Sequence, residues 1–186
     1  DFDYQLKKDL SPITAADNLS HDVISKRLKI LTPEIPILSE ENCDIPYKIR
    51  ANWTKYWLVD PLDGTKEFIK RNGEFTVNIA LIENNTPIFG VIHLPVTSET
   101  YWGSQVNGSF YSSGNNDVKE IRVSENHQNP IRLVASRSHP SKMLNSLLKK
   151  IVDYEIIEVG SSIKLCLIAS GQADLYPRFG PTSEWD

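Results

Sequence analysis

The stretch WLVDPLDGTKEF, residues 57–68, decides how this chain folds. Its apolar start has no polar alternation, which predicts a strand buried on both faces. Asp60 ends this strand, because Pro61 pre-sets a turn and prevents the strand from continuing. Asp63 then returns close to Asp60, and Gly64 lets the backbone approach a ligand closely. The stretch therefore predicts two carboxylates and a fixed turn within one small space.

Two carboxylates held so close together repel each other, so a proton, a basic side chain or a metal ion must neutralise them. Oxygen donors without His or Cys suit a hard cation such as Mg²⁺, Mn²⁺ or Ca²⁺. A bare Asp-Pro-x-Asp pattern equally describes ordinary turn residues. The longer string DPLDGTKEF, residues 60–68, is far more specific.

This string resembles the lithium-sensitive, magnesium-dependent phosphatases related to inositol monophosphatase. The residues that follow, KEF at 66–68 and NGEFT at 72–76, are similar to the CysQ branch, the 3'(2'),5'-bisphosphate nucleotidases. The resemblance extends from about Lys7 to Asp186. It implies a layered sugar-phosphatase fold of the α+β and α/β type, with an antiparallel-sheet half followed by an α/β half.

Composition agrees with a globular protein of one large or two small domains: 186 residues, 40% apolar, 24% charged, net charge −4. The negative charge argues against a surface that coats a nucleic acid polymer. Cys43 and Cys166 lie too far apart in sequence to suggest a disulfide framework or a zinc site, so we expect a reduced, cytoplasmic setting. No apolar run approaches the ~20 residues of a membrane-spanning helix.

The resemblance also implies chain beyond both ends of this sequence, and we expect residues 1–186 to be a truncated portion. We predict a metal-binding α+β half over residues 1–130 and a substrate-binding α/β half over residues 131–186. The sequence leaves open the oligomeric state and a peripheral association with the cytoplasmic face of the inner membrane.

In the first half, Thr14 as N-cap and Asp17 three residues later predict the start of a helix. The helix should end at Thr32-Pro33. Its expected buried stripe comprises Leu19, Val23, Ile24, Leu28 and Leu31. A short strand at 35–38 should end at Ser39-Glu40-Glu41. Further strands are predicted at 76–82, 88–94, 99–102 and 109–111, with an edge strand at 121–123 and a charged, surface-like segment at 67–74.

In the second half, strands and helices alternate, which is typical of an α/β arrangement. The loop 126–130 is the expected boundary between the halves. Strands are predicted at 132–135, 155–159 and 173–176, and helices at 141–152 and 161–170. The first of these helices should direct Met143, Leu144, Leu147, Leu148 and Ile151 inward.

Asp17 has two interpretations from the residues alone. It suits the first turn of a helix, where the favourable interaction of an acid with the helix dipole stabilises the helix by about 0.3–1 kcal/mol. The resemblance implies instead that Asp17 orients Thr65, which activates the attacking water. It also implies metal ligation by Glu40, Asp60, the Leu62 carbonyl, Asp63 and Asp186, with two or three Mg²⁺ ions bound and Glu40 serving catalysis. Glu41 would be a solvated neighbour.

Gly160-Ser161-Ser162 follows a strand and opens a helix, whose N–H groups attract anions. Simple capping by Ser161 also explains this pattern. The resemblance implies that these residues, Gly64 and Thr65 contact substrate. It extends the substrate site to Lys164, to Ser136 and His139, and to Arg178 and Asp186. From the residues alone, His139 fits a general acid, a nucleotide contact or a surface position, and Arg178 fits a phosphate contact or a surface ion pair.

The resemblance implies hydrolysis of adenosine 3',5'-bisphosphate to AMP and phosphate, with lithium sensitivity and a role in clearing a by-product of sulfate assimilation. Two alternatives stay open. One is a phosphatase of the same superfamily that acts on inositol or sugar phosphates. The other is an inactive fragment that binds metal or nucleotide.

Overall fold

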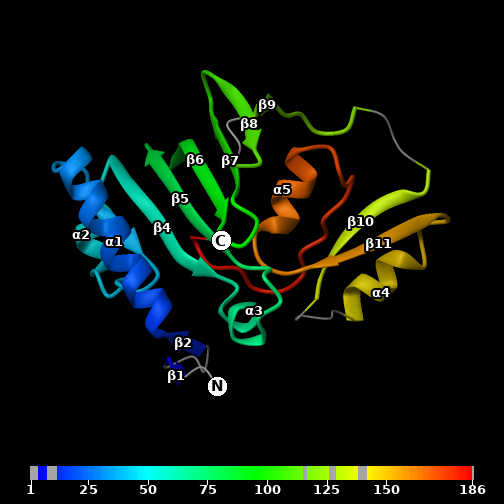
Figure 1. The fold of residues 1–186 in the computed structure, drawn as a ribbon, viewed down its shortest axis with the longest axis horizontal. Helices are drawn as coiled ribbons and strands as arrows, with labels where there is room; N and C mark the ends of the chain where they lie inside the picture. Colours follow the sequence, from blue (N-terminus) through cyan, green and yellow to red (C-terminus); the bar gives the residue numbers. More distant parts are fainter. Residues whose placement is uncertain (1–3, 8–11, 115–116, 126–128, 138–141, 186) are drawn as a thin grey trace.

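A seven-stranded sheet with helices beside it forms the centre of the computed structural model, which describes residues 4–7, 12–114, 117–125, 129–137 and 142–185 (Figure 1). The strand order is β3-β4-β5-β6-β7-β8-β9. The strands are β3 (Ile37–Ser39), β4 (Lys55–Asp63), β5 (Thr76–Glu83), β6 (Thr86–Leu94), β7 (Glu99–Ser104), β8 (Gly108–Ser112) and β9 (Val118–Glu120).

Tight turns connect β5 to β6 and β7 to β8, and from β4 to β9 every neighbouring pair is antiparallel. Asn84 and Asn85 both take positive φ, +49° and +59°, as a type I′ hairpin turn requires. These strands and turns confirm the predicted antiparallel half. The predicted edge strand at 121–123 is wrong, since the edge strand β9 ends at Glu120.

Strand β4 continues past Pro61, contrary to the predicted stop at Asp60. Asp60 pairs with Asn78 and Asp63 with Thr76, so the ladder shifts register between the two acids. Pro61 has no N–H to donate, and a bulge is where a strand tolerates proline. The bulge lets the strand run on while the two acids stay close in space.

Helix α1 (Ala15–Leu31) begins at the predicted N-cap and lies beside β4 at the left of Figure 1. The predicted buried stripe is wrong for Leu19, Val23 and Leu31, which are 61–74% exposed. The prediction is confirmed for Leu28, which is 7% exposed, and the other buried residues of the helix are Asp17 and Ser25. The helix contacts the sheet partly through polar groups, because the Ser20 hydroxyl donates a hydrogen bond to the Pro61 carbonyl over 2.9 Å. This contact turns the face with Leu19 and Val23 away from the sheet.

The second half pairs β10 (Ile131–Ser136) with β11 (Tyr154–Val159) in parallel, as the alternation of elements predicts. Helix α4 (Lys142–Leu148) ends four residues earlier than predicted, and Met143 is exposed rather than inward. Helix α5 (Ile163–Ala169) lies inside its predicted range. The predicted strand at 173–176 is only a single bridge, between Leu133 and Leu175.

Helix α5 packs between the large sheet and the β10–β11 pair (Figure 1). On one side Cys166 joins Leu94 and Tyr101 in an apolar cluster. On the other side Ile163 packs against the cluster of Val134, Val159 and Ala173, and it also touches the first cluster. The two predicted halves therefore share apolar contacts through α5, and their division at residue 130 stays a prediction.

Four short elements lie around this framework. Strands β1 (Tyr4–Leu6) and β2 (Pro12–Thr14) form an antiparallel pair before α1. Helices α2 (Tyr47–Arg50) and α3 (Thr65–Lys70) are one or two turns long. Cys43 and Cys166 are both free thiols. In the part of the chain that the structure describes, no helix is long and apolar enough to cross a membrane.

Candidate active site

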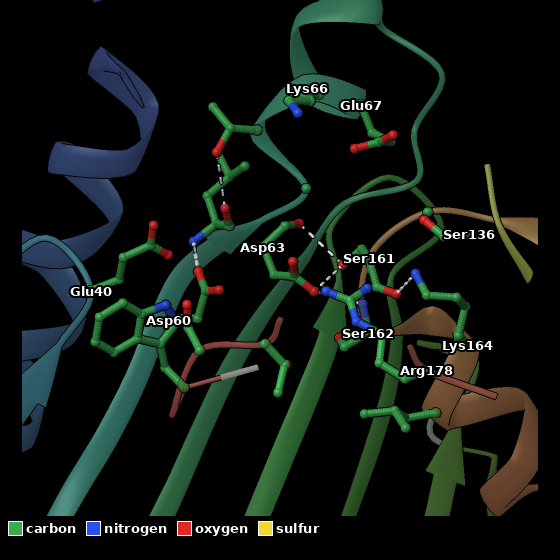
Figure 2. Close-up of a pocket in the computed structure, with 18 of the residues that line it drawn as sticks. Glu40, Asp60, Asp63, Lys66, Glu67, Ser136, Ser161, Ser162, Lys164 and Arg178 are labelled. Atoms are coloured by element: carbon green, nitrogen blue, oxygen red, sulfur yellow. Dashed lines mark hydrogen bonds between the residues drawn. The ribbon is translucent and has the colours of Figure 1, made fainter. Parts of the chain in front are cut away.

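A cavity of about 750 Å³ opens where the carboxyl ends of β3, β4, β10 and β11 approach one another (Figure 2). It gathers most of the predicted site residues from distant parts of the chain. Those lining it are Glu40, Asp60, Leu62, Asp63, Gly64, Thr65, Ser136, Gly160, Ser161, Ser162, Lys164 and Arg178. Two predicted residues, His139 and Asp186, lie outside the described residues.

The two acids of the central turn are held differently. Asp60 is 2% exposed, and its Oδ1 accepts a hydrogen bond from the Leu62 N–H over 3.0 Å. Asp63 reaches across the cavity, where its Oδ2 accepts from the Ser161 hydroxyl over 2.7 Å and from the Ser162 N–H over 2.6 Å. Asp63 therefore links the turn in β4 to residues Gly160–Ser162 of the second half, here called the serine turn.

Asp17 is 1% exposed and contacts both Thr14 and Thr65. Its Oδ2 accepts from the N–H and the hydroxyl of Thr14, which completes the predicted capping box. Its Oδ1 accepts from the Thr65 hydroxyl over 3.1 Å. Because the Thr65 hydroxyl donates its hydrogen to Asp17, its oxygen lone pairs can accept a hydrogen bond from a water in the cavity.

Glu40 and Glu41 share one lysine, a contact that the sequence analysis missed. The Lys7 ammonium lies 2.7 Å from a carboxylate oxygen of each. Burial acts to lower the pKa of Lys7, but hydrogen bonds to both glutamates outweigh it and raise that pKa. The prediction that Glu41 is solvated is wrong, since its side chain is 4% exposed and burial raises its pKa.

The donors around Asp60 fit a hard divalent cation. Glu40, Asp60, Asp63 and the Leu62 carbonyl offer only oxygen atoms, the ligands that Mg²⁺ prefers. Within the described ranges no three acidic, His or Cys side chains converge closely enough to form a ready metal cluster. The donor chemistry fits the cation, while Lys7 binds Glu40 and the Gly160–Ser162 turn binds Asp63.

The predicted helix opening at Gly160 is displaced, because α5 begins at Ile163 with Ser162 as its N-cap. Capping by the Ser161 side chain does not occur. Ser161 takes a positive φ of +56°, and Thr76 bonds both serine hydroxyls, at 2.6 Å and 2.7 Å. A buried hydroxyl network therefore holds Gly160–Ser162 as a turn against β5.

Two cations line the second-half wall of the cavity. The Lys164 ammonium donates to the carbonyls of Val159 and Ser161, and burial lowers the pKa of Lys164. Arg178 is exposed and donates to the Pro181 carbonyl over 2.6 Å. Figure 2 shows Arg178 and Lys164 on the same side of the cavity as Ser161 and Ser162.

Sequence reasoning missed further residues at this site. Glu67, predicted to be surface-like, is 4% exposed and lines the cavity with Lys66. Thr76 is fully buried beneath the serine turn. Glu67 stands inside the quoted string DPLDGTKEF, which was the available signal. The position of Thr76 in a predicted strand gave no such signal.

Comparisons with known proteins agree on one family. The model of the inositol monophosphatase family matches residues 1–186. The 3'(2'),5'-bisphosphate nucleotidase CysQ of Salmonella typhimurium is 50% identical over 185 residues, 99% of this chain and 73% of that protein. The protein of the same name from Escherichia coli K12 is 50% identical over 181 residues, 97% of this chain and 71% of that protein.

A solved structure agrees with these sequence matches. CysQ from Bacteroides thetaiotaomicron, described as a bacterial member of the inositol monophosphatase family, superposes with a TM-score of 0.83 at 43% identity. The match covers 97% of this chain and 72% of that one. With the family model matching from end to end, this chain belongs to the inositol monophosphatase family.

Proposed function

We infer that this protein is a magnesium-dependent 3'(2'),5'-bisphosphate nucleotidase that converts adenosine 3',5'-bisphosphate to AMP and phosphate, a reaction linked to sulfate assimilation. The observation that carries this inference is the two-sided cavity. One wall presents the acids Asp60 and Asp63, and the other presents hydroxyls, N–H groups and two cations. Relatives about 50% identical over nearly the whole chain are named for this activity.

Glu40, Asp60, Asp63 and the Leu62 carbonyl would hold two or three Mg²⁺ ions, with Asp186 as a further ligand. When bound there, the cation supplies Lewis-acid polarisation of the phosphate and acidification of a water molecule. Asp60 is buried, and the Leu62 N–H holds its Oδ1 in place. To bind the cation, the Glu40 carboxylate would have to break its ion pair with Lys7 or contact both the ammonium and the cation.

Thr65 and Asp17 would aim the attacking water. The Thr65 hydroxyl donates to Asp17, so its oxygen is left to accept a hydrogen bond from the water and to orient it in line with phosphorus. As the new oxygen–phosphorus bond forms, the bond from phosphorus to the 3′ oxygen breaks. Of the two protons of the attacking water, one ends on the 3′ oxygen and the other on the released phosphate, which gives AMP and phosphate.

The serine turn and the two cations would recognise the substrate. The N–H groups of Gly64 and Thr65 open helix α3, next to the Ser161 and Ser162 hydroxyls, and would cradle the reacting phosphate. Lys164 and Arg178 would contact the non-reacting phosphate. Ser136 and His139 would contact the nucleoside, and Asp186 the sugar hydroxyl region.

Phosphate release from adenosine 3',5'-bisphosphate with Mg²⁺, measured beside inositol 1-phosphate, tests this function. We expect release from the nucleotide, with a kcat/KM for inositol phosphate lower by at least about a hundredfold, since a second phosphate gains two charge-assisted contacts. Preference for inositol phosphate would favour the sugar-phosphate alternative. Magnesium binding by titration with no release from either substrate would favour the inactive-fragment alternative.

The variants Arg178→Ala and Lys164→Met separate substrate choice from the metal chemistry. Both should raise KM for the bisphosphate by about ten- to a hundredfold, because a phosphate loses a charged partner. Neither should change the release of phosphate from a minimal monoester such as p-nitrophenyl phosphate by more than a few-fold. Arg122→Ala, at an exposed arginine two residues after β9, is the matched control.

A further inference from the structure

Glu74 and Arg137 join the two walls of the cavity from outside it. Glu74 lies between α3 and β5, and Arg137 lies directly after β10. The guanidinium of Arg137 donates from two nitrogens to the two carboxylate oxygens of Glu74, each over 2.9 Å. It also donates to the Glu158 carbonyl in β11. This paired geometry has an orientation that a single lysine contact cannot reproduce.

The Glu74 carboxylate has a third partner. Its Oε2 accepts a hydrogen bond from the Gly160 N–H over 2.8 Å, at the start of the serine turn. The turn is packed tightly there, because a Cβ on Gly160 would lie 2.7 Å from the Glu67 Cγ and 3.0 Å from the Glu74 carbonyl oxygen. Glu74 therefore holds the first residue of the turn in both position and orientation.

The same turn also donates hydrogen bonds to Asp63, one of the proposed metal ligands. Two residues after Gly160, the Ser162 N–H donates to Asp63 over 2.6 Å, and the Ser161 hydroxyl donates to the same oxygen. A continuous set of contacts thus runs from Arg137 through Glu74 and the turn to Asp63. Neither Arg137 nor Glu74 is among the described residues that line the cavity.

We propose that Glu74 and Arg137 are a positioning pair, which sets the Gly160–Ser162 turn for phosphate binding without touching substrate. The proposal rests on the proposed function for its kinetic consequence. An exposed ion pair by itself contributes little, and the Arg137 side chain is 45% exposed. The effect comes from the Gly160 N–H, which loses a fixed charged acceptor when the pair is broken.

Four variants test the pair: Glu74→Gln, Arg137→Met, the combination of both, and the conservative Arg137→Lys. The readouts are kcat and KM for adenosine 3',5'-bisphosphate at saturating Mg²⁺, and amide hydrogen exchange of peptides that cover residues 160–166. We expect KM to rise about three- to thirtyfold in each single variant, with kcat within about threefold, because binding changes rather than the reacting groups. Exchange in the 160–166 peptide should accelerate.

Two comparisons sharpen the expected result. The double variant should be no worse than the worse single variant, because both remove the same interaction. Arg137→Lys should raise KM less than Arg137→Met does, since lysine keeps the positive charge but cannot form the paired hydrogen bonds to Glu74. The matched control is the pair Glu120→Gln and Arg122→Met, which breaks an exposed Arg–Glu contact of the same 2.9 Å length at the end of β9 and should change neither readout.

The outcomes separate the proposal from its rivals. A raised KM with unchanged exchange at 160–166 would overturn positioning and make Arg137 a direct substrate contact. Unchanged KM and unchanged exchange would overturn the proposal altogether. If the unmodified protein releases no phosphate from the nucleotide, the proposed function fails, and the exchange comparison alone still decides whether the pair holds the turn.

Discussion

The Thr65 hydroxyl donates a hydrogen bond to the buried Asp17 carboxylate over 3.1 Å, although 48 residues separate them in sequence. This contact links the first turn of α1 to the first residue of α3. Asp17 also caps α1 through Thr14, so one carboxylate serves the fold and the site. Its two roles can be separated by measuring stability and turnover in the same variants.

We expect Asp17→Asn to lower kcat by about 100- to 10,000-fold, the range of a lost general-base contribution. An amide can keep the cap on α1, so the free energy of unfolding should fall by only about 1 kcal/mol. Thr65→Val should lower kcat comparably, while Thr65→Ser should retain much of it. Equal kcat in Thr65→Val and the unmodified protein would contradict the role of the hydroxyl.

Asp60→Asn should abolish turnover while the protein stays folded. The amide oxygen can still accept the Leu62 N–H, but the loss of a carboxylate from the cation site should reduce kcat/KM by at least about a thousandfold. Calorimetric titration with Mg²⁺ and a thermal melt would accompany the assay. Full activity in this variant would remove Asp60 from the proposed ligands.

Lys7→Met should make Mg²⁺ bind more tightly. Lys7 and the cation both seek the Glu40 carboxylate, so removing the ammonium removes a competitor and a repulsion. For a partly exposed ion pair the gain in affinity should be about two- to fivefold, and it should shrink as ionic strength rises. An unchanged titration would mean that Lys7 and the cation do not compete, and Lys7→Arg provides the charge-retaining control.

Arg132 and Asp174 should make stability depend on acid pH. Hydrogen bonds from Arg132 lower the pKa of Asp174 to about 2. An aspartate in the unfolded chain has a pKa of about 3.9. The contribution of the Arg132–Asp174 pair to the free energy of unfolding is therefore fully present above that pH and is lost as the pH falls towards about 2. Chemical unfolding measured across this pH range should show that the free energy of unfolding falls less steeply with decreasing pH in Asp174→Asn than in the unmodified protein. An identical slope in both proteins would contradict this.

Local patterns determined much of the fold. The antiparallel strands from Thr76 to Ser112 follow from apolar runs broken by Asn84-Asn85 and Asn107-Gly108, because a hairpin depends on residues that are close in sequence. The start of α1 follows from Thr14 and Asp17 for the same reason. Where a prediction depended on which face of a helix meets a neighbour, it was wrong for Leu19 and Met143 but confirmed for Leu28.

The candidate site divides in the same way. The string DPLDGTKEF by itself determined that two acids, a turn and a hydroxyl lie together, since they occupy one short segment. Only the tertiary structure decided that Ser161 reaches Asp63 across 98 residues, and that Lys7 joins Glu40 and Glu41. Such contacts depend on how strands and loops distant in sequence pack together, and a single sequence carries no local pattern for that packing.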